Sequence, residues 1–185
     1  MEKHEYGNVF LLMLPLMVIM TGCSASTPDV QGASGADPIY RRAQVSHFIL
    51  EADYAGVGSA LTSGATQASL DISQAIQGNN PRGVLRIIQT NAPSFKKAVT
   101  LDRAKAKSMA SCSLPNGLSD GEQTTLRAVC KYSEIVHTEQ AAAFEDLLEA
   151  NEGNLIKKLN SYMAHRKKQF EISGKAEAEA RTLTN

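Results

Sequence analysis

Aromatic residues are scarce in this chain, and an excess of either charge is missing altogether. Tryptophan is absent, and aromatic residues make up 5% of the 185 positions. The 19 Lys and Arg residues are equal in number to the Asp and Glu residues. A nucleic-acid binder depends on clustered cations that neutralise phosphates. The charge balance therefore argues against nucleic acid as a partner. The composition is instead rich in small and straight-chain residues, which favour helix over sheet.

A long apolar run is also missing. A membrane-spanning helix needs about 20 apolar residues in a row. The main apolar run covers residues 9–20 only, and its length is typical of the core of a signal peptide. The run does not end in an A-x-A-like cleavage site. It ends instead in residues 20–23, which read Met-Thr-Gly-Cys.

The stretch 20–23 resembles the lipobox of bacterial lipoprotein precursors. The resemblance covers residues 1–23, and it implies that residues 1–22 are a removed signal peptide and that Cys23 is lipidated. By analogy with that family, Ser24 after the cysteine implies anchoring in the outer membrane, facing the periplasm, rather than in the inner membrane. The alternative interpretation is a buried helix or an uncleaved anchor.

Residues 23–36 are expected to form a flexible tether behind the lipid. Residues 24–36 are small or polar, with one Pro, two Gly and no large apolar side chain. Such a segment has too little apolar surface to offset the entropy of ordering. The folded domain should therefore begin at about residue 37, close to the membrane surface.

From residue 37 onward, apolar residues recur at helical spacing, and no useful strand-like alternation appears. The sequence therefore predicts an all-α fold, a small bundle of about five to six helices over residues 37–173, followed by a polar tail over 174–185 that frays. The predicted helical segments are 37–55, 61–76, 82–90, 93–111, 120–150 and 155–173.

Local signals set the ends of these segments. Asp37 and Pro38 are typical of an N-cap and a first helical residue. Pro93 separates two predicted helices, and Ser119 with Glu122 forms a capping-box pattern. The predicted core rows include Val45, Phe48, Ile49, Ala52; Leu61, Ala65, Ala68, Ile72, Ile76; Leu126, Val129, Val136, Ala143, Phe144, Leu147, Leu148; and Leu155, Ile156, Leu159, Tyr162, Met163, Phe170.

Two cysteines remain once Cys23 is assigned to lipid, and they are predicted to form a disulfide. Cys130 lies about 16 Å along the predicted helix from its start, whereas the Cα atoms of a disulfide lie within about 7 Å. A Cys112–Cys130 bridge therefore requires residues 113–119 to run back along that helix as a strap. Two buried free thiols are the alternative. A zinc site is not expected, because the spacing is not C-x-x-C and no His pair is near.

No catalytic motif is found, so we expect no enzyme, no cofactor and no metal. His47, His137 and His165 are isolated in the sequence. An enzyme would gain support if His137 met Glu134 or Glu139 in a cleft. A possible basic contact patch for headgroups or an acidic partner comprises Lys157, Lys158, Arg166, Lys167 and Lys168.

These features favour a membrane-anchored, non-catalytic lipoprotein that binds another protein. It would be an accessory of an envelope, secretion or conjugation assembly, or a protective immunity or exclusion factor. The alternative is a helical lipoprotein that binds a small molecule or lipid in a pocket between helices lined by Val, Ile and Met.

The anchor leads to a direct prediction. Replacing Cys23 by Ala removes the thiol that would be acylated, and acyl chains contribute about 0.8 kcal/mol per buried methylene to membrane binding. We expect the variant to move from the membrane fraction to the soluble fraction on cell fractionation. A variant that stays in the membrane would contradict the lipoprotein interpretation.

Overall fold

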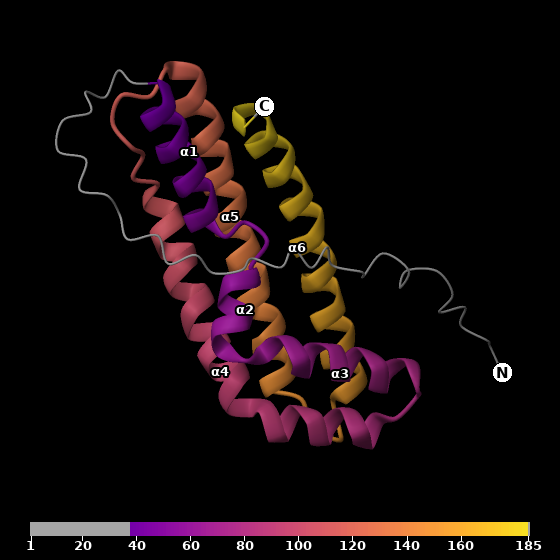
Figure 1. Ribbon diagram of the computed structural model, residues 1–185. Helices are drawn as coiled ribbons and strands as arrows, with labels where there is room; N and C mark the ends of the chain where they lie inside the picture. Colours follow the sequence, from indigo (N-terminus) through magenta and orange to yellow (C-terminus); the bar gives the residue numbers. More distant parts are fainter. Residues whose placement is uncertain (1–37, 185) are drawn as a thin grey trace. The chain divides into compact units, whose positions relative to one another are not determined.

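The described part of the chain, residues 38–184 of the computed structural model, is an all-α fold, as the sequence predicts. Within this range there are six helices (Figure 1). They are α1 Pro38–Ala52, α2 Val57–Ser63, α3 Ala65–Gln77, α4 Pro81–Ser111, α5 Asp120–Leu148 and α6 Leu155–Thr184. None of these helices is long and apolar enough to cross a membrane. The predicted signal peptide, Cys23, the tether and Asp37 lie outside the described residues.

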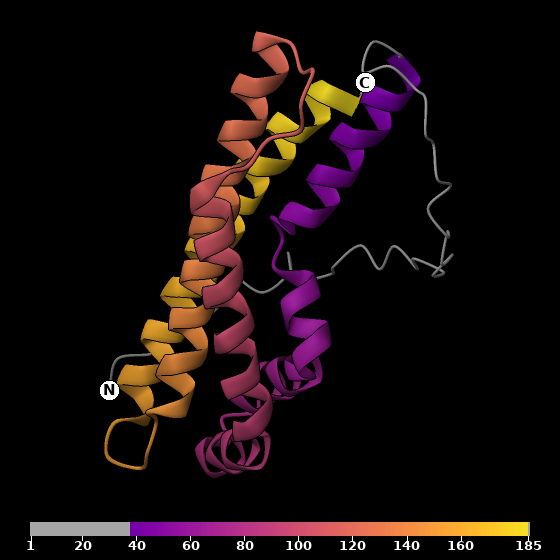
Figure 2. The ribbon, with the colours of Figure 1, turned by 90° about the vertical axis from the view of Figure 1, so that its left-hand side faces the viewer.

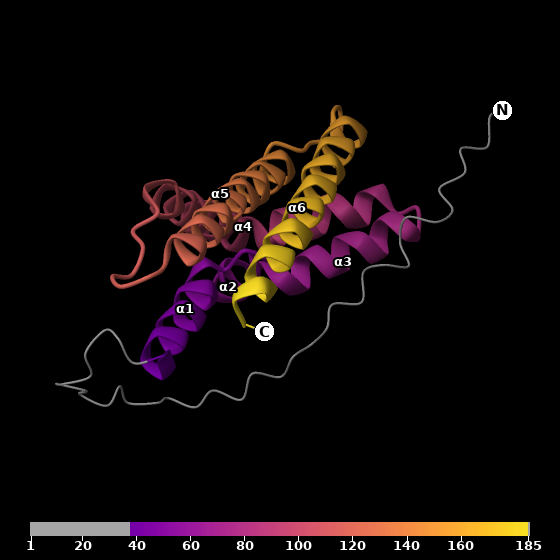
Figure 3. The same ribbon diagram turned by 90° about the horizontal axis from the view of Figure 1, so that it is seen from above.

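The helices pack around α5, which lies between α4 and α6 and contacts both along much of its length. Figures 1 and 2 show α4, α5 and α6 running side by side. Helix α1 packs on α5 and α6, whereas α2 and α3 pack on α4. Seen from above, α2 links α1 to α3 (Figure 3). The shorter helices therefore cover the three long ones.

The predicted start of α5 is confirmed in detail. The Ser119 hydroxyl accepts a hydrogen bond from the Glu122 backbone N–H, and the Glu122 carboxylate accepts one from the Ser119 N–H at 2.7 Å. This reciprocal capping satisfies two donors that a helix N-terminus leaves unpaired. The expected break between α5 and α6 is also confirmed, because residues 149–154 form no helix.

The predicted division at Pro93 is wrong, because α4 continues through it. Proline removes one helical hydrogen bond and costs about 3 kcal/mol inside a helix. The buried residues Val84, Ile88 and Phe95 lie on one face across the proline, and each stabilises the fold by about 1.5–3 kcal/mol. Burial therefore outweighs the cost of the proline. The ribbon of α4 bends between the part beside α3 and the part beside α5 (Figure 1).

The predicted helix over 61–76 is also wrong in one respect, because it is divided into α2 and α3 at Gly64. Gly64 has φ of +75°, a left-handed conformation that glycine adopts without steric cost. The new helix starts in a different rotational phase. As a result Ala65 is buried as expected, but Leu61 is 63% exposed.

The predicted polar tail is helical instead. Helix α6 extends to Thr184, and both Ala176 and Ala180 are buried. Small side chains add little apolar area, but they allow neighbouring helices to approach closely. Two residues expected in the core row of α6, Ile156 and Phe170, are exposed.

The apolar core consists of two clusters at different levels of α5. The first cluster comprises Ala65, Ala68, Ile72, Val84, Ile88, Phe95, Ala98, Ala143, Phe144, Leu147, Leu155 and Tyr162. Within it, the rings of Phe95 and Phe144 stack with centroids 5.4 Å apart. The second cluster comprises Val45, Ile49, Ala52, Met109, Leu118, Leu126, Val129, Cys130 and Ala180.

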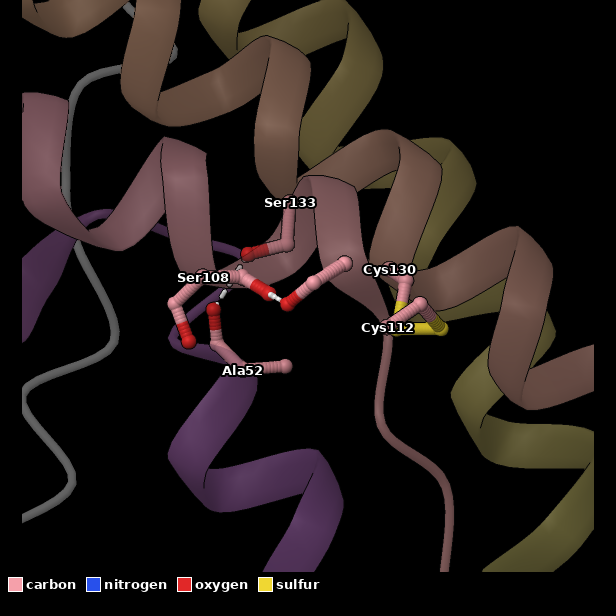
Figure 4. The surroundings of a disulfide bond; sticks show 6 residues. Ala52, Ser108, Cys112, Cys130 and Ser133 are labelled. Carbon is pink, nitrogen blue, oxygen red and sulfur yellow. Dashed lines mark hydrogen bonds between the residues drawn. A yellow bond between two sulfur atoms is a disulfide. The ribbon is translucent and has the colours of Figure 1, made fainter.

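The disulfide and the strap are confirmed. Cys112 and Cys130 are bonded, with their Cα atoms 5.8 Å apart. Between the end of α4 and the start of α5, residues 112–119 run alongside α5 (Figure 2). Leu118 is buried in the second cluster, and Leu114 packs against it. Figure 4 shows the bridge beside Ser133, whose hydroxyl donates to the Ala52 carbonyl. The bridge thus attaches the strap to the helix that also holds the end of α1.

The bridge is expected to contribute to stability. Replacing Cys112 and Cys130 by Ser opens a loop of 18 residues in sequence separation, and the chain-entropy model assigns such a loop about 3 kcal/mol. The free energy of unfolding in urea should fall by that amount. As a control, the wild type under reductant should match the double variant, and an unchanged urea midpoint in both would contradict the prediction.

Candidate functional site

A layer of buried polar side chains separates the two apolar clusters. We call it the polar layer, and it comprises Asp102 of α4, Ser133, His137 and Gln140 of α5, and Gln169 of α6. All five side chains are essentially inaccessible to water. Buried polar groups are tolerated when they are hydrogen-bonded. Most polar atoms of this layer have hydrogen-bond partners, whereas Asp102 Oδ2 and His137 Nε2 have none among the described residues.

The polar layer binds the backbone of the turn between α1 and α2. The Ser133 hydroxyl donates to the Ala52 carbonyl, and the Gln140 amide donates to the Gly56 carbonyl at 3.0 Å. The Gln169 amide donates to the Ala55 carbonyl at 3.3 Å. A turn has backbone groups that no helix satisfies, and leaving them buried and unpaired is costly. Side chains from α5 and α6 supply the missing donors.

Gly56 is the point where the turn comes closest to the polar layer. Its φ is +69°, and a Cβ atom there would lie 2.3 Å from Gln140 Oε1 and 2.9 Å from Gln169 Nε2. Real Cβ atoms essentially never lie so close to another atom. Only glycine therefore fits both the conformation and the space.

His137 of α5 lies between a carboxylate of α4 and a carboxylate of the turn. Its Nδ1 lies 2.8 Å from Asp102 Oδ1, and its Nε2 lies 3.9 Å from Asp53 Oδ2. The Asp53 carboxylate also accepts the backbone N–H groups of residues 57, 58 and 59, at the start of α2. The positive end of a helix dipole stabilises a carboxylate in that place. Asp53 thus caps α2 and faces the imidazole at once.

An imidazole oriented by a buried carboxylate is also found in catalytic sites, where the other ring nitrogen faces a nucleophile. Here Nε2 faces the Asp53 carboxylate, and the His137 side chain is fully buried. The buried ring thus links α4, α5 and the turn through a single side chain. Glu139, one of the two residues whose convergence with His137 would have supported an enzyme, contacts His165 and Lys168 instead. Among residues 38–184, no group of three His, Cys, Asp or Glu residues is placed to hold a metal.

A second ionic cluster lies between α5 and α6, around Glu139. His165 Nδ1 lies 2.7 Å from Glu139, and Lys168 lies 2.5 Å from its other oxygen. Burial raises the pKa of the Glu139 carboxyl, but the hydrogen bonds from His165 and Lys168 lower it by more. The pKa of Glu139 is therefore below its usual value, and the charged carboxylate favours the folded state at neutral pH.

The predicted basic patch is dispersed around α6. Lys158 donates hydrogen bonds to Glu149 and Asp146, and these bonds raise the pKa of its ammonium group. Successive residues of a helix are 100° apart, so residues 166–168 point in different directions. The residues of the expected patch meet the following groups: Arg166 meets Gln169 and the Phe170 ring, Lys167 meets Glu171, Lys168 meets Glu139, and Lys157 lines a surface hollow over residues 152–160.

The turn between α1 and α2 also borders an open surface hollow of about 380 Å³. Its lining comprises Leu50, Glu51, Asp53, Gly58, Ser59, Thr62, Leu101 and Lys105. Leu50, Val57 and Leu61 are each more than half exposed. Because Val57 and Leu61 are four residues apart on α2, they form a row next to the row of Gly58 and Thr62. We call the hollow and these three apolar residues the turn surface.

Sequence reasoning missed Asp53, Asp102, Gln140 and Gln169 as important residues. A signal for Asp102 and Gln140 was present, because both occupy positions where a core residue is expected. Asp102 lies four residues after buried Ala98, and Gln140 lies four residues before buried Phe144. A polar residue in an apolar row indicates a buried hydrogen-bond network.

Comparisons of the chain with models of protein families, with curated proteins and with solved structures find no match.

The close contact at Gly56 yields a prediction. Gly56→Ala should lower the free energy of unfolding by about 2 kcal/mol or more, because it adds left-handed strain and displaces Gln140 and Gln169 from buried partners. Thermal unfolding followed by circular dichroism measures the effect. Gly174→Ala is the matched control, because nothing lies within 4 Å of a Cβ there. In a helix interior it should stabilise by about 0.5–1 kcal/mol. Equal effects in the two variants would contradict the role given to Gly56.

Proposed function

We propose that this protein is a lipid-anchored, periplasm-facing module that binds another protein of the cell envelope through the turn surface. The lipobox-like stretch at Cys23 supports the anchor. The Cys112–Cys130 disulfide supports the compartment, because disulfides persist in oxidising, extracytoplasmic surroundings. An accessory role in an envelope, secretion or conjugation assembly, or a protective immunity or exclusion role, is compatible with both.

The observation that favours protein binding is the exposure of Leu50, Val57 and Leu61. Leu50 lines the hollow, and Val57 and Leu61 lie on α2, which contributes Gly58, Ser59 and Thr62 to its lining. Single exposed apolar residues are ordinary, but a group rimmed by polar residues marks an interaction site. Glu51, Asp53 and Lys105 supply that rim. The polar layer fixes the backbone beneath it, so a partner meets a preformed surface and ordering it costs little.

The same observation favours a protein over a small molecule. A ligand site encloses most of its ligand and is lined mainly by apolar side chains. The hollow at the turn surface is open to solvent and has a mixed lining. The hollow over residues 152–160 is likewise open and is formed by a single segment of chain. The interior Val and Ile side chains are packed against one another in the two clusters.

Photo-crosslinking in intact cells tests the proposal. A benzophenone amino acid in place of Leu61 should give a discrete covalent adduct with a partner protein. The control places the same amino acid at Ile156, which is equally apolar and also exposed. We expect no such adduct from the control. No adduct from position 61, or the same adduct from both positions, would contradict the turn surface as the binding site.

A further inference from the structure

Helix α4 concentrates positive charge in a chain whose overall charge is balanced. Its only acidic residue is Asp102, whose side chain is fully buried. Its basic residues are Arg82, Arg86, Lys96, Lys97, Arg103, Lys105 and Lys107. The composition of the whole chain hides this imbalance, because α5 carries more acidic than basic residues. The surface of α4 is therefore cationic.

The cations that follow Pro93 adjoin the turn surface. They lie on the part of α4 that runs beside α2 and α5 (Figure 1). Residues 96, 100, 103 and 107 are three or four apart and form one row on the helix, and residues 97, 101 and 105 form the next row. Leu101 and Lys105 of the second row line the hollow. We call the following residues the cationic face: Lys96, Lys97, Arg103, Lys105 and Lys107.

Most of the charge on the cationic face is not neutralised within the described fold. Lys96, Lys97 and Lys107 are exposed, and no carboxylate among residues 38–184 pairs with them. The Lys105 ammonium donates to the Glu51 carbonyl at 2.5 Å, which is a neutral group. Arg103 pairs with a carboxylate, that of Glu145. Four cations are therefore available to carboxylates of another molecule.

The turn surface is smaller than a stable protein interface. Specific interfaces involve about 20–30 residues of each partner, whereas the turn surface consists of the residues that line the hollow together with Val57 and Leu61. A partner that binds there covers neighbouring surface as well. The cationic face continues the lining of the hollow along α4, so it is a direct extension of the site.

The cationic face and the turn surface together fit an acidic protein better than a membrane or a nucleic acid. None of the large exposed apolar residues lies on α4, whereas a helix that lies in a membrane interface buries an apolar face. A nucleic acid would meet the cations but would leave Leu50, Val57 and Leu61 uncovered. A protein can supply both apolar side chains and carboxylates.

We propose that the partner of the turn surface is a protein with an acidic segment, whose carboxylates pair with the cationic face while an apolar side chain beside them covers the turn surface. This inference rests on the proposed function of the turn surface. Lys96 and Lys107 lie about 16 Å apart along α4. The carboxylates of the partner are spread over a similar length, which is about three turns of helix or about five extended residues. Such complementary charges fix the orientation of the partner and speed its association.

Charge reversal on the two parts of α4 tests the proposal. The benzophenone amino acid at position 61 is combined with Lys96→Glu and Lys97→Glu, or with Arg82→Glu and Arg86→Glu as the matched control. All four residues are exposed, and the control pair lies on the part of α4 beside α3 (Figure 1). We expect the adduct yield in intact cells to fall roughly tenfold or more in the first variant only, because like charges across an interface oppose binding. Equal urea midpoints show that both variants fold.

Zero-length coupling tests the chemistry of the partner. A carbodiimide joins a lysine amine to a carboxylate that pairs with it and takes up the water that is lost, and mass spectrometry locates the new amide bond. We expect bonds from Lys96 or Lys97 to Asp or Glu of the protein that position 61 captures. In the Lys96→Arg and Lys97→Arg variant the charge is kept but the amines are absent. The adduct from position 61 should then persist while this coupling disappears.

The possible failures are distinct. No adduct from position 61 in the otherwise unchanged chain overturns the proposed function and this inference with it. An adduct that Lys96→Glu and Lys97→Glu leave unchanged, or that both pairs of substitutions weaken equally, retains the turn surface and overturns the acidic partner. An adduct with twice the mass of the chain identifies a second copy as the occupant and also overturns it. Loss of binding to phosphatidylglycerol vesicles, with the adduct retained, assigns the cationic face to lipid instead.

Discussion

The hydrogen bonds from the polar layer to the α1–α2 turn are the constraint on which this arrangement depends. Three backbone carbonyls, those of Ala52, Ala55 and Gly56, are satisfied by side chains of α5 and α6. Each of them would cost about 1–3 kcal/mol if it were buried without a partner. The side chains therefore select one position for the turn. That position places α1 on the second apolar cluster and α2 on α4.

The N-terminal half of α5 is attached to two other segments. Cys130 bonds the strap, and Ser133, three residues later, binds the end of α1. Residues three apart lie on the same side of a helix, one turn from each other. The covalent and the polar attachment thus adjoin, at the level of the second apolar cluster. No aromatic side chain is among the buried members of that cluster, and Phe48 and Tyr54 pack against it while partly buried.

The sequence was sufficient to predict the helices, the capping box at Ser119 and the strap, because periodicity, local hydrogen bonding and disulfide geometry are short-range constraints. It was insufficient at Pro93 and at Gly64, where burial and backbone conformation are decided by packing between helices. The pairing of Asp102 with His137 joins residues 35 positions apart, and no local pattern indicates which polar residues meet. The burial of Ala176 and Ala180 likewise depends on how closely α6 approaches its neighbours.

The position of the turn has a mechanical consequence. A pull on the N-terminal side of the chain enters the described fold at Pro38 and is passed along α1 to the hydrogen bonds at Ser133 and Gln140. The large apolar cluster of α3, α4, α5 and α6 lies beyond them along the chain. Load is therefore borne first by the apolar contacts of α1 with the second cluster and by a few directional bonds at the turn. The large cluster contains no residue of α1, so its packing does not depend on the contacts that meet the load first.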